Sequence, residues 1–243
     1  MILGTTIPVF EQLKQFLQWF LTEIHTTTGL TWGWSIVVLT AIVRLALVPL
    51  TVKQQQSMRE MQALQPEIKK IQEAHQGDRQ AAQAALMEFY KEHGVNPFGS
   101  CLPMVAQIPI FIALYYSLRG DKHYKADGTP LNFLGSFVPD ITESLHHLRQ
   151  DHLLTLIVLM SIYVGSQMLS TLLVPSTADK TQKYLFLGMP LIFAAFIVNS
   201  GFPIGVMLYW ITTNIWTVGQ GAVIRKYFPT PQMQKAQADK EIE

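Results

Sequence analysis

Few charges and a single cysteine narrow the classes to which this chain of 243 residues can belong. Charged residues make up 14% of it, whereas a soluble domain usually carries about 25%. The one cysteine, Cys101, excludes an intramolecular disulfide and has no second thiol with which to bind a metal. The net charge of +1 supplies no bulk field to attract nucleic acid, so no direct nucleic-acid recognition is expected.

Motifs for catalysis or cofactor chemistry are also missing from the sequence. It contains no glycine-rich phosphate loop, no spaced metal ligands, and no Ser–His, paired-Asp or zinc motif of an intramembrane protease. His146, His147 and His152 lie near one another, but no cysteine or paired carboxylate accompanies them, which favours a structural or solvent role. We therefore expect no enzyme activity, no cofactor and no metal.

Apolar segments dominate what is present, and five of them are candidates to cross a bilayer, which takes about 20 residues in a helix. The fourth segment is the shortest and contains Pro190, which neighbouring helices can accommodate inside a membrane. The sequence predicts an all-α membrane protein, a single domain over residues 1–243. The expected transmembrane helices are residues 33–52, 97–118, 153–174, 184–199 and 202–224.

Lysine and arginine counts set the expected orientation of these spans. Twelve of these residues lie in the segments 53–96, 175–183 and 225–243, and five lie in the segments on the other side. Because cytoplasmic loops are enriched in Lys and Arg, the N-terminus is expected outside and the C-terminal tail, 225–243, in the cytoplasm. An odd number of spans agrees with that arrangement.

Two segments outside the spans have helical patterns. Residues 1–31 place apolar side chains at helical spacing, with charged and amide side chains on other faces. This is typical of an amphipathic helix in the membrane interface, and a helix packed on the outside of a bundle is the alternative. Residues 53–94 predict a cytoplasmic helical hairpin, which turns at residues 75–78. Its six basic and six acidic residues favour protein contact, unless the hairpin is only a spacer.

Arg44 lies inside the first apolar segment and carries most of the functional information. A guanidinium stays charged wherever it lies, and holding it near mid-membrane costs roughly 2.5–3.5 kcal/mol. Such a charge normally faces a polar cavity or a partner. Snorkelling toward a helix end is the alternative, but residues 45–52 still follow Arg44, about 12 Å of helix.

Three stretches together resemble the YidC/Oxa/Alb family of membrane protein insertases, over about residues 30–228. The first is Asn-Pro-Phe-Gly-Ser-Cys-Leu-Pro at 96–103, continued by residues 107–111 and 113–115. The second is Phe-Pro-Ile-Gly at 202–205, followed by Leu-Tyr-Trp at 208–210, Asn214 and Gln220. The third is Ile-Val-Arg-Leu at 42–45, followed by Pro49 and Leu50.

The resemblance implies a five-helix core with an intramembrane groove that is open to the cytoplasm and to lipid, and lined by Arg44. Polar residues in other spans fit such a groove, because Tyr163, Ser166, Gln167, Ser170 and Thr171 fall on one helical stripe. Hydrogen bonding between helices is the alternative for the stripe alone. The residues expected to line the groove are Arg44, Gln107, Gln167, Ser170, Trp210 and Asn214.

In function, the resemblance implies an insertase and chaperone of the bacterial inner membrane that acts on nascent membrane proteins without needing the Sec translocon. Nascent membrane proteins and lipids are the expected partners, and the Sec translocon and the ribosome are candidates. Two family features are missing, a large extracytoplasmic domain before the core and a long basic tail, and the second absence puts tight ribosome docking in doubt. A small-anion transporter or channel that uses Arg44 is the main alternative, and an assembly chaperone is a third.

Overall fold

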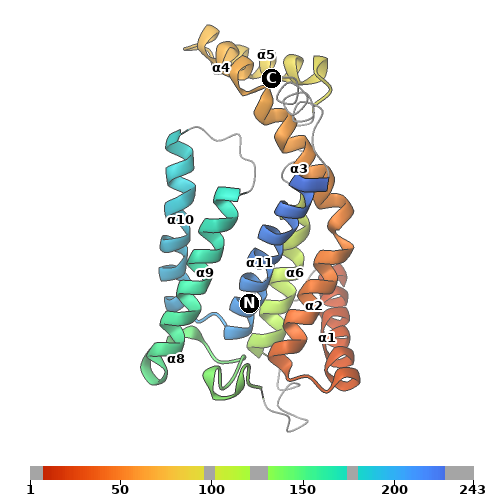
Figure 1. Ribbon diagram of the computed structural model, residues 1–243, viewed down its shortest axis with the longest axis vertical. Helices are drawn as coiled ribbons and strands as arrows, with labels where there is room; N and C mark the ends of the chain where they lie inside the picture. Colours follow the sequence, from red (N-terminus) through yellow and green to blue (C-terminus); the bar gives the residue numbers. More distant parts are fainter. Residues whose placement is uncertain (1–7, 96–101, 121–130, 174–179, 228–243) are drawn as a thin grey trace, which may run out of the picture.

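Helices form all the regular structure of the bundle in this computed structural model, which describes residues 8–95, 102–120, 131–173 and 180–227. The upright helices in Figure 1 are α2 (Trp32–Ala46), α6 (Leu102–Gly120), α9 (Leu153–Leu173), α10 (Lys180–Asn199) and α11 (Ile204–Tyr227). Helix α11 is central, because it packs against α9, α2 and α6, while α10 packs on α9. The predicted all-α class is confirmed.

Length and composition single out a smaller set of membrane-spanning candidates among the described residues. Helix α9 is long and apolar enough to cross a membrane alone. Residues 10–28 and 32–46 pass the same test only as a pair, with a bend of 115° between them, and residues 184–199 form a shorter apolar helix. The number of spans therefore stays a prediction. The start of the expected span 97–118 and most of the tail 225–243 lie outside the described residues.

The expected first span, residues 33–52, is divided in the structure. Helix α2 ends at Ala46, and α3 (Val48–Ala63) begins after Leu47. Pro49 lies in the first turn of α3, where its missing N–H costs nothing. The Leu47 N–H still donates to the Val43 carbonyl at 3.1 Å. The two helices therefore form one kinked column that continues past residue 52 toward the hairpin (Figure 1).

The hairpin is present but shorter than the predicted 53–94. Helix α4 (Gln65–Ala74) packs against α5 (Arg79–Glu92), and Ile68 is buried between them. The Asp78 carboxylate caps α5 by accepting from the Gln80 and Ala81 N–H groups at 3.0 Å. Residues 53–63 belong to α3 instead, because the proline that starts the new helix is Pro66. Buried Gln55 and Arg59 mark that part of α3 as bundle.

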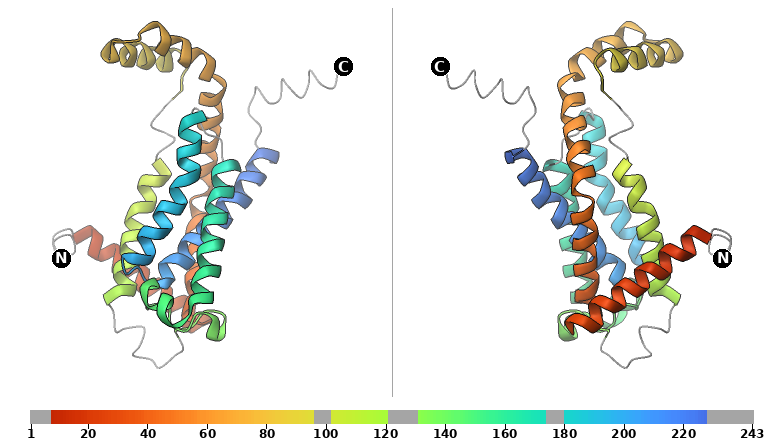
Figure 2. Two further views of the ribbon diagram at one scale, coloured as in Figure 1. Left: turned by 90° about the vertical axis from the view of Figure 1, so that its left-hand side faces the viewer. Right: turned by 90° about the vertical axis from the view of Figure 1, so that its right-hand side faces the viewer.

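Helix α1 (Pro8–Thr28) lies obliquely against the bundle (Figure 2). It buries Leu17, Leu21 and Ile24 against α2 and α6, as the packed alternative expects. The His25 ring stacks on Trp32 at a centroid distance of 4.1 Å, which secures the turn between α1 and α2. Interfacial placement of residues 1–31 stays a prediction.

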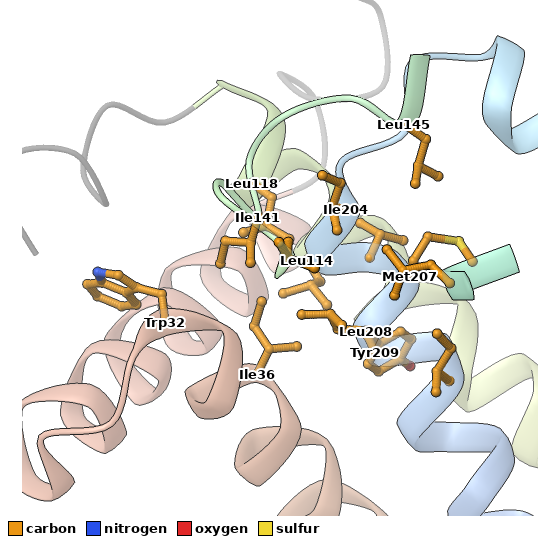
Figure 3. Packing of buried hydrophobic residues seen from close by; sticks show 14 of the residues in the cluster. Trp32, Ile36, Leu114, Leu118, Ile141, Leu145, Ile204, Met207, Leu208 and Tyr209 are labelled. Carbon is orange, nitrogen blue, oxygen red and sulfur yellow. The ribbon is translucent and has the colours of Figure 1, made fainter. Parts of the chain in front are cut away.

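The segment 131–145 closes the end of the bundle opposite the hairpin. Its backbone is tied to the start of α11, because the Ile204 N–H donates to the Glu143 carbonyl at 2.9 Å and the Gly205 N–H to the Ile141 carbonyl at 2.8 Å. Ile141 and Leu145 are fully buried with side chains from α2, α6 and α11 (Figure 3). The short helix α8 (Leu145–Asp151) then leads into α9. Among the described residues, this end contains many of the fully buried side chains.

Candidate functional site

A cavity of about 800 Å³ lies among α2, α3, α9, α10 and α11. It is open to the outside of the protein rather than enclosed. Its polar side chains come from every one of these helices except α10, which contributes apolar ones. The polar lining consists of Arg44, Gln54, Gln167, Ser170, Thr171, Thr213, Asn214 and Thr217, and the apolar and aromatic lining of Met58, Tyr163, Phe186, Met189, Pro190, Phe193 and Trp210.

Among the described residues that line the cavity, Arg44 supplies the only formal charge. It lies in the last turn of α2 and is half-buried. Within the described part of the chain, no carboxylate forms an ion pair with it, and Tyr209 of α11 interacts with it electrostatically. Among the described residues, the cavity therefore holds a positive charge that no carboxylate neutralises.

The polar stripe of α9 faces this cavity, apart from one residue. Tyr163, Gln167, Ser170 and Thr171 line it. Ser166 instead accepts a hydrogen bond from the Asn214 amide of α11 at 3.3 Å. Each explanation of the stripe therefore applies to different residues. Ser166 takes part in a hydrogen bond between helices, whereas the other four residues of the stripe line the cavity.

Aromatic rings fill the end of the cavity nearer the segment 131–145. Trp210 stacks on Phe111 of α6 at a centroid distance of 4.8 Å and meets Phe193 of α10 edge-on at 5.3 Å. Phe202, at the turn before α11, lies 6.1 Å from Trp210 and 5.1 Å from Tyr115. Rings from three helices and a turn thus separate the cavity from the closed end of the bundle.

Helix α3 extends the cavity toward the hairpin through Gln54 and Met58. The sequence interpretation missed both residues, because it assigned everything after residue 52 to the hairpin. They follow Arg44 by 10 and 14 residues, which is about three and four helical turns. Continuing the helical period across Pro49 would have found them.

The cavity-lining residues of α10 were also missed by the sequence interpretation, but for a different reason. Phe186, Met189 and Phe193 are apolar residues in an apolar helix, and nothing in their spacing separates cavity-facing from lipid-facing positions. For Gln107 the prediction and the structure differ in the other direction. It was expected in the groove, but it is absent from the cavity lining. Its helix α6 packs on α1 and α11, on the other side of α11 from α9. The other five expected residues all border the cavity.

The comparisons of this chain with a family model and with individual proteins agree with one another. The family model described as 60Kd inner membrane protein matches residues 23–232. A protein of Streptomyces avermitilis named membrane protein insertase YidC is 38% identical over 259 residues, covering 96% of this chain. One of the same name from Francisella tularensis subsp. novicida is 35% identical over 215 residues, covering 88%.

A solved structure has the same overall fold. The crystal structure of an active YidC insertase with its first transmembrane domain resolved superposes with a TM-score of 0.60 at 30% identity, covering 90% of this chain. The relatives are longer proteins. The chain spans 60% of the Streptomyces protein, 36% of the Francisella protein and 46% of the chain in the crystal structure.

Proposed function

Because the chain belongs to the 60Kd inner membrane protein family, we propose that it is a membrane protein insertase that also assists the folding of its substrates. Its substrates are nascent membrane proteins, and it acts in the bacterial inner membrane. The relatives named as insertases support this function over a small-anion transporter or channel. The observation that carries it is the open cavity that combines one unneutralised charge with polar and apolar walls.

Arg44 attracts the short, often acidic, external tail of a substrate into the cavity. A charge pair is stronger where water is scarce than in bulk solvent, so the guanidinium lowers the barrier for a carboxylate to leave the cytoplasm. Gln167, Ser170 and Asn214 offer hydrogen bonds to the tail along the way. The six residues Arg44, Gln107, Gln167, Ser170, Trp210 and Asn214 remain our assignment of the substrate groove, with Gln107 the weakest member because it is absent from the cavity lining.

The apolar part of the substrate moves along the open side of the cavity beside α9 and α10. Exposed apolar side chains on these two helices include Leu169 on α9 and Met189 and Ile192 on α10, of which Met189 also lines the cavity. Release of a spanning helix into lipid is downhill, at about 25 cal/mol per Å² of apolar surface removed from water. The membrane potential adds about 2.3 kcal/mol per charge per 100 mV for outward movement of an acidic tail. No nucleotide is therefore required.

The hairpin α4–α5 lies on the cytoplasmic side, where it receives or guides the substrate before the cavity. The segment 131–145 then faces outward, and the five helices α2, α6, α9, α10 and α11 form the spans. The Sec translocon and the ribosome are further partners in this proposal. Membrane lipids border α9 and α10.

Cysteine crosslinking tests the proposal at the cavity. In a chain whose Cys101 is replaced by Ser, Ser170→Cys places a thiol in the cavity lining. A stalled nascent chain with a cysteine in its external tail is expected to form a disulfide with this variant. Trp19→Cys is the control, because Trp19 is exposed on α1, which packs on α2 and α6. Equal crosslinking at both positions would contradict a substrate path through the cavity.

A further inference from the structure

We propose that Gln220 of α11 is a positioning residue for the substrate cavity. Its side-chain amide links α11 to α3 and holds α3 at the angle that keeps Gln54 and Met58 in the cavity wall. Capture of a substrate by this wall depends on that angle. The inference rests on the proposed insertase function, but the position of α3 can be measured without an insertion assay.

The column of α2 and α3 has its kink just before the part of α3 that lines the cavity. Leu47 separates the two helices, and Pro49 follows it in the first turn of α3. Proline has no N–H with which to bond the preceding turn, and sharp helix kinks commonly occur at proline. Gln54 and Met58 lie beyond the kink. A change of angle at the kink therefore moves both side chains relative to α9 and α11.

Gln220 reaches α3 at this kink. Its Nε2–H donates to the Thr51 hydroxyl, and Thr51 is buried. The Thr51 hydroxyl in turn donates to the carbonyl of Leu47 at 3.1 Å or to that of Val48 at 3.0 Å. A hydroxyl that bonds back to the preceding turn often bends a helix. The amide from α11 is thus attached to the residues that form the kink.

A second hydrogen bond fixes the direction in which the Gln220 amide points. Trp216, one turn earlier on α11, donates its indole N–H to the Gln220 Oε1 at 2.9 Å. Because an indole nitrogen can only donate, the amide oxygen must face Trp216, which leaves the amide nitrogen for Thr51. The amide therefore has one orientation that satisfies both neighbours, and it holds the two helices in one arrangement.

The contact between α3 and α11 continues one turn further along α3. A Cβ added to Gly221 would lie 3.9 Å from the Gln55 Nε2, and Gln55 is buried. One face of α3 thus packs on α11, while Gln54 and Met58 border the cavity. Gln220 is not among the described residues that line the cavity. It therefore acts through α3 and not by touching a substrate.

Distances between spin labels in the purified full chain test the position of α3. In a background with Cys101→Ser, labels at Lys53→Cys on α3 and Leu172→Cys on α9, both exposed positions, report the separation of these helices. Gln220→Leu removes both hydrogen bonds of the amide and is expected to shift or broaden this distance. Labels at Val223→Cys on α11 and Leu172→Cys should report the same distance with and without the substitution.

Insertion kinetics in sealed liposomes supply the functional readout. Gln220→Leu is expected to raise the substrate concentration for half-maximal insertion roughly 2- to 10-fold, the factor that one hydrogen bond contributes. The maximal rate should change less, because Arg44 is retained. Thr51→Val removes the hydroxyl at nearly constant shape and should reproduce both effects. Thr51→Ser keeps the hydroxyl and should retain the link and the unmodified kinetics.

The matched control is Thr212→Val on the same helix. The Thr212 hydroxyl donates to the Leu208 carbonyl at 2.7 Å, a bond within α11, and its side chain does not line the cavity. The distance between α3 and α9 and the insertion kinetics should both be unchanged. Equal effects of Thr212→Val and Gln220→Leu would overturn the proposal. An unchanged distance between α3 and α9 in both Gln220→Leu and Thr51→Val would also overturn it.

The two readouts separate this inference from the insertase function. If the chain inserts substrates but Gln220→Leu leaves α3 in place, the inference fails and the function stands. If Gln220→Leu moves α3 without altering insertion, the inference fails as well, because capture then does not depend on the angle of α3. If Gln220→Leu moves α3 but the unmodified chain inserts nothing, the link stands and the proposed function fails.

Discussion

Two glycines mark where the closed end of the bundle has no room for a side chain. A Cβ on Gly33 would lie 2.6 Å from the Cβ of Phe133, and a Cβ on Gly205 would lie 2.7 Å from a methyl of Leu118 and 3.3 Å from the Ile141 carbonyl. The segment 131–145 therefore sits directly on the backbones of α2 and α11. At these two positions, one added methyl group would overpack the closed end of the bundle.

Gly33→Ala is expected to lower the free energy of unfolding by about 1–3 kcal/mol, the usual cost of overpacking. Phe133 cannot swing away, because the clash falls on its Cβ rather than on the end of its side chain. Thermal or denaturant unfolding in detergent measures the effect. Gly165→Ala on α9 is the control, since nothing lies within 4 Å of its added Cβ, and alanine there is expected to be neutral or slightly stabilising. Equal stability of the two variants would contradict the close contact.

Arg44→Ala is expected to reduce insertion of substrates with acidic tails more than insertion of substrates with uncharged tails. The reason is that only a charged tail loses its attraction when the guanidinium is removed. Arg44→Lys, which keeps the charge, should retain a larger part of the activity. Protease protection of matched tails in liposomes measures both effects. Equal loss for charged and uncharged tails would count against an electrostatic role.

At the scale of elements, α3 is the connection between the cavity and the hairpin. Its first half contributes Gln54 to the cavity, and the Gln220 amide of α11 donates to the Thr51 hydroxyl. Its second half leads into α4 and α5, which lie beyond the bundle (Figure 1). In the proposed function, a substrate that contacts the hairpin is thus one helix, α3, away from the cavity.

Replacing residues 65–93 by a short Gly-Ser linker is expected to reduce insertion while leaving the bundle folded. The deletion removes α4 and α5 but retains buried Gln55, Arg59 and Met61 on α3. A larger deletion from residue 56 would remove Arg59 and Met61 and so confuse folding with function. Insertion assays and unfolding of the same preparation measure the two properties. Full insertion by a folded deletion variant would reduce the hairpin to a spacer.

Prediction from sequence worked where one pattern dominates an element. The described helix α9, Leu153–Leu173, matches the predicted span 153–174 to within one residue, because no proline or charged residue interrupts it. Its polar stripe places Gln167 and Ser170 correctly beside the cavity. Prediction failed where the sequence pattern did not show where an element ends or which of its faces meets the cavity. Proline kinks the α2–α3 column without ending it, and the apolar α10 gives no signal of which face meets the cavity.

At the scale of the whole molecule, the closed and open ends differ in construction. The end at 131–145 is held by backbone hydrogen bonds and fully buried side chains such as Ile141 and Leu145. The cavity reaches toward the opposite end, where α3 leads to the hairpin. No periodicity in the sequence predicted this cap, because its contacts join residues far apart in the chain. In the proposed orientation, the closed end at 131–145 faces outward and preserves the membrane barrier.

Thiol labelling of intact spheroplasts tests that orientation. In the background lacking Cys101, His147→Cys, at an exposed position of α8, should react with a membrane-impermeant maleimide. Glu73→Cys, exposed on α4, should react only after the membrane is permeabilised. These expectations follow from the excess of Lys and Arg on the hairpin side. Labelling of Glu73→Cys in intact spheroplasts would reverse the orientation.

Insertion by the purified chain in sealed liposomes tests the central claim most directly. A newly synthesised single-span substrate with a short acidic tail is added from outside, and protection of the tail from protease is scored. The account predicts protection that depends on this chain alone, without nucleotide or other factors. No protection in the presence of folded protein, confirmed by its cooperative unfolding, would contradict autonomous insertion.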